Sequence, residues 1–204
     1  MEYSFILLGY LLGSIPFGLV FARLGGYGDI RAIGSGNIGA TNVLRTGNKM
    51  LALLTLICDT LKGAVAVWLS FNSGDAFIIL ATGLFAVLGH MYPVWLKFKG
   101  GKGVATTLGT MLAIMPMLGL IMCGIWLLMA LIFRISSLAA LTAFAAAPVI
   151  AMALLGDYNL ALLAGLIAAL VFWRHKENIK RLLKGEEPKI GKKKDKNDAS
   201  PASQ

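Results

Sequence analysis

The chain has 204 residues, of which 57% are hydrophobic and 14% are charged. This small share of charged side chains could not cover the exterior of a soluble globular domain. The composition therefore excludes that class and indicates an integral membrane protein. Lys and Arg outnumber Asp and Glu by 19 to 10, and we interpret the net charge of +9 mainly as a sign of membrane orientation rather than of a nucleic-acid partner.

Long apolar runs divide the chain into predicted membrane helices. A run of about 20 apolar residues crosses a hydrocarbon core of about 30 Å. Residues 3–22 and 76–96 reach this length without Asp, Glu, Lys or Arg, and 50–71 is apolar except for Asp59 and Lys62. No basic segment precedes the first run, so we expect a retained span rather than a removable signal peptide.

Two further runs, 103–133 and 135–173, are too long for one crossing each. Lys and Arg favour the cytoplasmic flanks of spans, so the basic residues that flank the first run should lie on one side, with two helices between them that break at Pro116. A turn at 156–159 divides the second run in the same way. The predicted fold class is all-α: a polytopic integral membrane protein with seven transmembrane helices, its N-terminus outside and its C-terminus cytoplasmic.

This topology segregates the basic residues. Every Lys and Arg except Lys62 falls on the cytoplasmic side, whereas a six-span arrangement would place the basic tail outside. We expect residues 1–188 to form a single transmembrane domain and 189–204 to form a basic, disordered cytoplasmic tail suited to lie against anionic lipid. Cys58 and Cys123 lie inside apolar runs, so we expect neither a disulfide framework nor a cysteine metal site.

The first cytoplasmic loop, residues 24–49, is too long and too rich in glycine to be only a connector. Its segment 34–42, GSGNIGATN, fits the G-x-G-x-x-G pattern, but a membrane helix precedes it where a dinucleotide fold needs a strand. Glycines let backbone N–H groups approach an anion, and Arg45 adds a planar fork suited to phosphate. The alternative is a flexible solvated loop.

Residues 97–107 form a second glycine-rich segment, at the predicted start of a helix. Leu96 and Gly103 stand where a Walker A motif needs Gly and Ser or Thr, so that motif is not present. A helix N-terminus with free N–H groups, a lysine and three glycines is nevertheless a general phosphate site. The alternative is that the lysines serve only to set the topology.

The third segment, 174–183, directly follows the last predicted span. Its apolar residues have helical spacing, which by itself would indicate an interfacial amphipathic helix. On such a helix His175, Asn178 and Arg181 share roughly one face, and that face can point toward the other two loops.

Ionisable residues also lie inside the predicted spans. Asp59 and Lys62 are helical neighbours near mid-membrane, where either a mutually neutralising structural pair or a direct substrate role fits them. His90, at the inner end of its span, is expected to be a structural hydrogen-bonding residue rather than a base.

Anion-binding loops beside acyl chains favour an enzyme that joins a phosphorylated water-soluble substrate to a lipid-derived one. The clustered aspartates needed for phosphatidyl transfer from CDP-lipids and the H-x-x-x-x-D motif of acyl-CoA-dependent acyltransferases are both missing. The alternative is a membrane carrier or channel for a phosphorylated metabolite, but no polar through-pathway is apparent in the spans.

Over Gly9 to about Ile190 the chain resembles the bacterial PlsY-type acyl-phosphate:glycerol-3-phosphate acyltransferases. The resemblance rests on GSGNIGATNVLR at 34–45, DTLKG at 59–63, GHMYPV at 89–94, FKGGKGVAT at 98–106 and RHKENI at 174–179. Tyr92 and Trp95 stand where the family often has Phe, a departure that affects no catalytic position.

The resemblance implies transfer of a fatty acyl group from acyl phosphate to the 1-hydroxyl of sn-glycerol 3-phosphate, giving lysophosphatidic acid and inorganic phosphate. This is the first committed acylation in phospholipid synthesis. It implies a multi-pass protein of the bacterial cytoplasmic (inner) membrane whose active site faces the cytoplasm. It also implies no cofactor, no metal and no nucleic-acid partner, but a functional link to the enzyme that makes acyl phosphate.

Carried over position by position, the expected catalytic residues are Ser35, Arg45, Lys102, His175 and Asn178. The expected substrate-binding residues are Gly34, Gly36, Asn37, Gly39, Thr41, Asn42, Gly100, Gly101 and Gly103, the last three being associated in the family with glycerol 3-phosphate.

Two of these roles stay open. Ser35 fits a phosphate ligand better than an acyl-enzyme nucleophile, because the sequence places no base beside it. His175 is the candidate base for the glycerol hydroxyl but equally a phosphate donor, and a phosphate oxygen of the substrate is a third acceptor for the proton.

Overall fold

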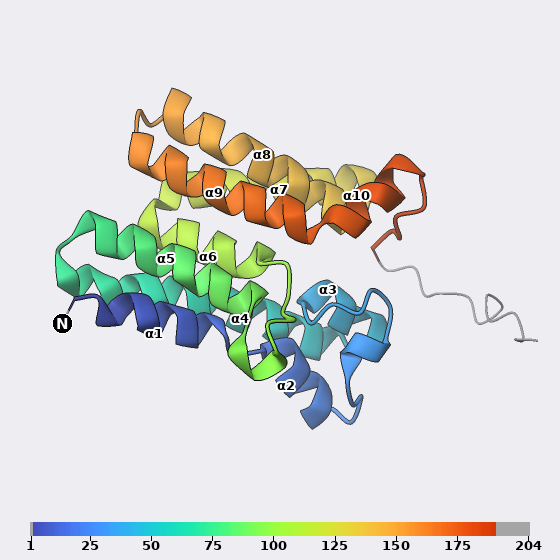
Figure 1. Cartoon of the computed structure of the whole chain (residues 1–204). Helices are drawn as coiled ribbons and strands as arrows, with labels where there is room; N and C mark the ends of the chain where they lie inside the picture. The colour runs from blue at the N-terminus through green and yellow to red at the C-terminus, as the bar shows by residue number, and fades with distance from the viewer. Residues whose placement is uncertain (1, 191–204) are drawn as a thin grey trace, which may run out of the picture.

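The computed structural model describes residues 2–190, which are helical with no strand in that range. Long helices run side by side in one bundle, and α2, α3 and α10 gather at the end opposite to the N-terminus (Figure 1). The α-helices are α1 (Ser4–Gly13), α2 (Phe17–Leu24), α3 (Ala40–Val43), α4 (Lys49–Ser70), α5 (Ala76–Met91), α6 (Val104–Ile114), α7 (Pro116–Phe133), α8 (Ser136–Ala153), α9 (Tyr158–Arg174) and α10 (Lys176–Leu183). Short 3-10 turns lie at η1 (Ile30–Ala32), η2 (Leu44–Thr46), η3 (Phe71–Ser73) and η4 (Val94–Leu96).

Five helical segments are long and apolar enough to cross a membrane, and a sixth is added if α9 and α10, bent by 66°, count as one span. The remaining predicted crossing is α6, whose 11 residues fall short of a span by length. An all-α protein with apolar spans is therefore observed, whereas the count of seven crossings and their orientation stay predictions. The predicted tail lies outside the described residues from 191 onward, and nothing tests the division at 188.

The predicted breaks at Pro116 and at 156–159 are confirmed. Met115 has an extended backbone and Pro116 begins α7, where its missing N–H costs nothing. Gly156 adopts a positive φ of 64°, and the Asp157 carboxylate then caps α9 by accepting a hydrogen bond from Leu160 N at 2.9 Å. The prediction missed a break in the first run, where Pro16 separates α1 from α2 because proline lacks an N–H group and restricts the residue before it.

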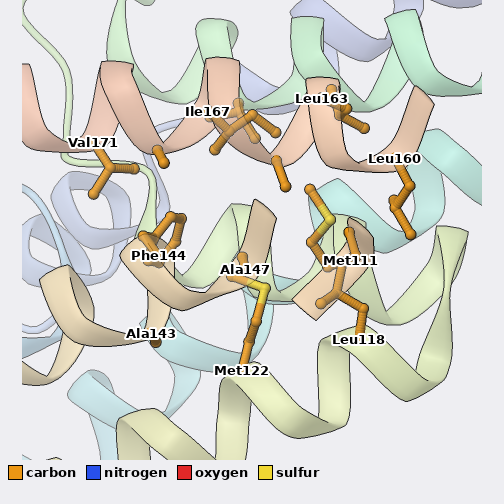
Figure 2. Close-up of a cluster of buried hydrophobic side chains, with 14 of the residues drawn as sticks. Met111, Leu118, Met122, Ala143, Phe144, Ala147, Leu160, Leu163, Ile167 and Val171 are labelled. Carbon is orange, nitrogen blue, oxygen red and sulfur yellow. The ribbon is translucent and has the colours of Figure 1, made fainter. Parts of the chain in front are cut away.

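The largest apolar core lies between α6, α7, α8 and α9, with Val87 and Met91 of α5 at its edge (Figure 2). It combines three alanines and Phe144 of α8 with larger apolar side chains of α9 such as Leu160 and Ile167. In lipid such packing replaces the hydrophobic effect as the force between helices. Elsewhere glycines bring helices together: a Cβ at Gly13 would overlap the Ala86 backbone, and one at Gly109 would overlap that of Thr60.

The ionisable residues predicted inside the spans form a buried cluster. Lys62 Nζ lies 2.7 Å from Asp59 Oδ1 and donates to the Ile15 carbonyl oxygen at 2.8 Å. His90 Nδ1 lies 3.7 Å from the same carboxylate oxygen, which is too far for a hydrogen bond. The ammonium thus binds a backbone carbonyl at the break between α1 and α2, which also accepts from Phe17 N at 3.1 Å, so the structure favours the structural interpretation of this pair.

The buried ion pair generates a stability prediction. Lys62→Met leaves Asp59 without a partner in the interior, so we expect a loss of about 3–5 kcal/mol of unfolding free energy. The double variant Asp59→Leu/Lys62→Met removes both charges and should recover most of that loss. Thermal unfolding in detergent micelles measures both, and Lys49→Met, at an exposed position of α4, is the matched control. A double variant less stable than Lys62→Met would contradict the prediction.

Candidate active site

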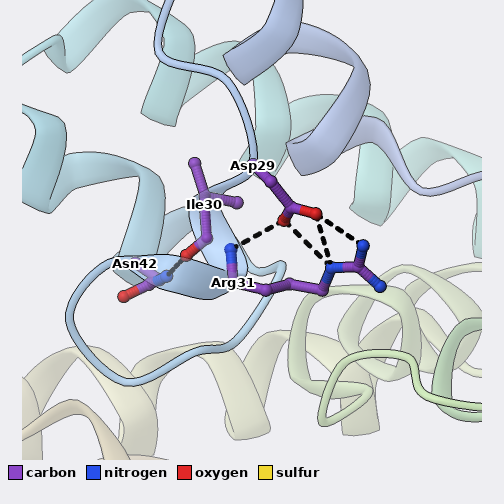
Figure 3. Close-up of polar contacts among 4 residues, drawn as sticks. All are labelled: Asp29, Ile30, Arg31 and Asn42. Atoms are coloured by element: carbon purple, nitrogen blue, oxygen red, sulfur yellow. Dashed lines mark hydrogen bonds and ion pairs between the residues drawn. The ribbon is translucent and has the colours of Figure 1, made fainter.

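Asn42 organises the first glycine-rich loop. Its buried side-chain Nδ2 donates to the carbonyl oxygens of Ile30 at 2.9 Å, Ile33 at 3.1 Å and Asn37 at 2.7 Å, the first of which appears in Figure 3. Its Oδ1 accepts from Ser35 N at 3.0 Å and from Ser35 Oγ at 3.2 Å. One amide therefore closes the loop on itself, which shows that the segment is an ordered structure rather than a flexible solvated loop.

Asp29 and Arg31 form an exposed pair at the start of this loop (Figure 3). Hydrogen bonds from Arg31 lower the pKa of the Asp29 carboxyl to about 2, and the same carboxylate caps the η1 turn. The charge of Arg31 is thus matched within its own turn. Arg45, by contrast, is close enough to Lys102 in the second glycine-rich segment to act on it electrostatically.

The absence of a side chain at Gly34 leaves room for the Arg45 side chain. Gly34 has a positive φ of 58°, and a Cβ there would lie 2.6 Å from Arg45 Cδ and 2.8 Å from Arg45 Nη1. Any larger residue would push the guanidinium away from Ser35 and its neighbours. The loop reaches α8 as well, since Thr41 Oγ1 lies 3.3 Å from Ser136 Oγ.

The second glycine-rich segment is held from two sides. Gly100 N and Gly101 N donate to the carbonyl oxygens of Met91 and His90 at 3.1 and 3.0 Å. Arg174, at the end of α9, donates to the Gly100 and Gly101 carbonyl oxygens at 2.6 and 3.1 Å. The N–H groups of these two glycines are therefore used inside the protein and do not face a ligand.

Close packing explains these glycines better than a phosphate cradle does. A Cβ at Gly101 would overlap the His90 ring, and one at Gly100 would overlap the His90 carbonyl group. Gly103 has a positive φ of 82° and packs against Met91. The donors left for an anion are the first-turn N–H groups of α6, which have no acceptor within the helix.

Lys102 lies directly before that helix start, among several charged groups. Burial lowers the pKa of its ammonium to about 8, opposed by the negative charge of Glu187 and reinforced by nearby guanidiniums. The guanidiniums belong to Arg181, Arg45 and Arg174, which come from α10, η2 and α9. Lys102 is thus still mostly charged at neutral pH but loses its proton more readily than an exposed lysine.

His175 lies at the bend between α9 and α10 and is buried. Its Nδ1 is 2.8 Å from the Val171 carbonyl oxygen, which can only accept, so Nδ1 carries the proton. Burial and the positive charge of Lys102 lower the pKa of His175 to about 4. The ring is therefore neutral at physiological pH, and its Nε2 is an acceptor rather than a donor.

Asn178 leads to a residue that sequence reasoning missed. Its Nδ2 donates to Glu187 Oε1 at 2.6 Å, and the same carboxylate accepts from Ser137 Oγ at 2.8 Å and from Arg181 Nε at 2.7 Å. Burial raises the pKa of Glu187, but these three hydrogen bonds outweigh it and leave the pKa below its ordinary value. The only signal in the sequence is a pair of acidic residues, 186–187, within a basic stretch.

The structure thus gathers the predicted site residues into two adjoining groups. One is the loop group of Gly34, Ser35, Asn42 and Arg45. The other is the helix-end group of Lys102, His175 and Asn178, to which the structure adds the unpredicted Glu187; the electrostatic interaction of Arg45 with Lys102 joins the two groups. Gly36, Gly39 and Asn37 lie in the loop, and Asn37 Oδ1 is a buried acceptor without a hydrogen-bond partner.

The comparison with known proteins covers nearly the whole chain. The profile of the glycerol-3-phosphate acyltransferase family matches residues 3–185. The chain belongs to this family. Two similar relatives are glycerol-3-phosphate acyltransferases, from Caulobacter vibrioides (59% identical, covering 95% of this chain and 90% of the relative) and from Paramagnetospirillum magneticum (60% identical, covering 91% and 92%).

Solved structures of the family agree with the fold. The chain is similar to PlsY (YgiH), an integral membrane glycerol 3-phosphate acyltransferase crystallised in its glycerol 3-phosphate form, with a TM-score of 0.88, 43% identity and coverage of 93% of this chain and 96% of that one. The lysophosphatidic acid form of PlsY gives a TM-score of 0.86 at 42% identity. Family membership and the all-helical membrane fold predicted from the sequence are thereby confirmed.

Among residues 2–190, no group of three or more His, Cys, Asp or Glu lies close enough together to hold a metal ion. That the reaction needs no metal and no cofactor stays a prediction, as does the identity of each site residue.

Proposed function

We propose that the protein transfers a fatty acyl group from acyl phosphate to the 1-hydroxyl of sn-glycerol 3-phosphate. The hydroxyl oxygen bonds to the acyl carbon, the bond from that carbon to the phosphate oxygen breaks, and lysophosphatidic acid and inorganic phosphate result. The observation that carries the proposal is the cationic cluster around Lys102, joined to an ordered glycine loop in a chain of this family.

The reaction suits a site built from fixed cations. Acyl phosphate is a mixed anhydride, so its phosphate leaves readily once the negative charge is neutralised, and preorganised cations act most strongly where charge develops. Arg45 and Lys102 are the residues we assign to that charge, with the first turn of α6 as a further set of donors. Arg45 offers two parallel donors and Lys102 a point charge.

The proton of the glycerol hydroxyl needs an acceptor. Neutral His175 presents Nε2 as a hydrogen-bond acceptor, which suits orienting the hydroxyl for attack. A histidine whose pKa is about 4 holds a proton poorly at pH 7, so we assign the final acceptor to a phosphate oxygen of the substrate and the orienting role to His175. Of the alternatives left open, the proposal thus adopts the phosphate oxygen as the proton acceptor, and His175 serves neither as the base nor as a phosphate donor but orients the hydroxyl.

Ser35 is assigned as a phosphate ligand. Its Oγ donates to Asn42 Oδ1, and within residues 2–190 no histidine or carboxylate accepts its proton, so nothing activates it as a nucleophile.

Asn178 completes the catalytic set. Gly34, Gly36, Gly39 and Thr41 are proposed to shape the substrate side of the loop, and Asn37 to use its free acceptor. Asn42, Gly100, Gly101 and Gly103 support the site through packing and hydrogen bonds of their own.

We further propose seven crossings with the N-terminus outside. The connections that contain η3, Pro116 and Gly156 lie at the end of the bundle nearest the N-terminus and have no Lys or Arg, while the three basic segments lie at the other end (Figure 1). Basic loops favour the cytoplasm, so the site would face the cytoplasm of a bacterial inner membrane, where soluble glycerol 3-phosphate and a lipid-borne donor meet. The enzyme that makes acyl phosphate is the expected functional partner.

A donor assay tests the proposed reaction. Purified protein in lipid vesicles, given palmitoyl phosphate and glycerol 3-phosphate, should release phosphate only when both are present. Palmitoyl-CoA should not replace palmitoyl phosphate, because no feature of the site suits a nucleotide. Equal turnover with palmitoyl-CoA would refute the donor assignment. A carrier, the alternative function, would move a phosphorylated metabolite without releasing phosphate from palmitoyl phosphate.

The role of Ser35 can be measured separately. Losing one hydrogen bond to a charged group costs about 1.5–3 kcal/mol, so Ser35→Ala should lose activity roughly 10- to 150-fold and keep a measurable remainder. Arg45→Ala should lose more, because a charge disappears with the donors. Ser73→Ala, at the far end of the bundle, is the matched control. Mass spectrometry of a stable acyl adduct on Ser35, discharged by glycerol 3-phosphate, would overturn this assignment.

Reporter fusions test the topology. A reporter inserted after Asp75 or after Asp157 should respond as external, and one after Lys99 as cytoplasmic. Each position lies in a connection between helices, so the insertion does not interrupt a span. An external reporter at Lys99 would invert the whole arrangement.

A further inference from the structure

Glu187 is an acidic residue among the cations of a site that we propose to bind anionic substrates. Its side chain is only 7% exposed, and its carboxylate accepts three hydrogen bonds: one from Ser137 of α8 and two from Asn178 and Arg181 of α10. A buried carboxylate costs desolvation free energy and repels an anionic substrate, so its presence here calls for a role in the site. Its partners are informative, because one of them, Asn178, belongs to the proposed catalytic set.

The segment that delivers Glu187 is itself fixed. After α10, Gly185 turns the chain with a positive φ of 70°, and Ile190 N donates to the Arg134 carbonyl oxygen at 2.6 Å. The chain thus returns from α10 to the start of α8 and sets the carboxylate between these two helices.

We infer that Glu187 is a positioning residue for acyl transfer: it fixes the Asn178 amide and the Arg181 guanidinium, and its negative charge offsets the cations that surround Lys102. With Nδ2 directed at Glu187, Asn178 has its Oδ1 left to accept from a substrate hydroxyl. Four cations lie near one another at this end of the bundle: Lys102, Arg45, Arg174 and Arg181. Without a nearby negative charge, each would disfavour the charged form of the others. This inference rests on the proposed function, which assigns catalytic roles to Asn178 and Lys102.

The charge effect has a definite sign. The groups that face Lys102 are Glu187 from the segment after α10, Arg181 from α10, Arg45 from η2, and Arg174 and His175 from the end of α9. Glu187 is the one that raises the pKa of Lys102, against burial and the three guanidiniums. Removing its charge must lower that pKa from about 8, so Lys102 would lose its proton at a lower pH.

The test compares Glu187→Gln with Glu186→Gln, which makes the same chemical change at the exposed preceding residue. The titration of Lys102 is read from the pH dependence of its modification by an amine reagent, followed by mass spectrometry. We expect its midpoint to fall in Glu187→Gln and to stay unchanged in Glu186→Gln. The alkaline limb of kcat/KM should move to lower pH in the same variant, because kcat/KM reports ionisations of the free enzyme.

A conservative variant separates positioning from charge. Glu187→Asp keeps the charge but shortens the side chain, so we expect the alkaline limb near its wild-type place and kcat lowered about tenfold or more through the loosened Asn178 contact. Wild-type kcat and KM in Glu187→Asp would overturn the positioning role, even if Glu187→Gln does not fold. An unchanged Lys102 titration in folded Glu187→Gln would overturn the charge role.

Two further outcomes are decisive. A lower KM for glycerol 3-phosphate in Glu187→Gln, with an unmoved alkaline limb, would make Glu187 an internal competitor of the substrate anion and refute the inference. Wild-type protein inactive with acyl phosphate would refute the proposed function, whereas the Lys102 titration needs no turnover and still tests the charge role of Glu187.

Discussion

The ion pair of Asp59 and Lys62 is the constraint on which the site end of the bundle depends. Lys62 binds the backbone carbonyl of Ile15 at the break between α1 and α2, and His90 approaches the Asp59 carboxylate from α5. The His90 carbonyl in turn holds Gly101. This buried charged cluster therefore connects three parts of the chain. They are the break between α1 and α2, helix α4, and the glycine-rich segment that contains Lys102. Moving any member would leave a desolvated charge.

Around this anchor the site is assembled from segments that hold one another. Arg174 closes the glycine segment from the side of α9, and Asn42 closes the first loop from within. The Asn42 amide is thereby fully used inside the loop, and two of the Arg174 guanidinium nitrogens are held by backbone carbonyl oxygens. The groups that we assign to the ligand include the Arg45 guanidinium, the Lys102 ammonium, the first-turn N–H groups of α6 and the Nε2 of a neutral His175. A site of this kind gains its selectivity from being preorganised.

Local signals carried most of the prediction. Proline at 116, the turn at 156–157 and the spacing of His175 and Asn178 act within a few residues, so those two breaks and the inward face of α10 followed from the sequence, whereas the break at Pro16 did not. The contact of Ser137 with Glu187 spans 50 residues and depends on how α8 packs beside α10, which no pattern contains. Asn42 was expected to bind substrate because its type and place allow it. Only the fold reveals that its amide is already taken.

The length of α6 has a consequence for where the chemistry happens. Eleven residues rise only about 16 Å, roughly half the thickness of a hydrocarbon core, and Figure 1 shows α6 between longer neighbours. Under the proposed seven-span topology, the polar segment at its start lies at a depth that acyl chains usually occupy. Protein must line that recess, since lipid cannot satisfy its N–H groups. In the proposed reaction, a water-soluble acceptor would therefore descend to the acyl donor, while a single-chain product formed there would already have its tail at the level of the bilayer interior and need only diffuse sideways.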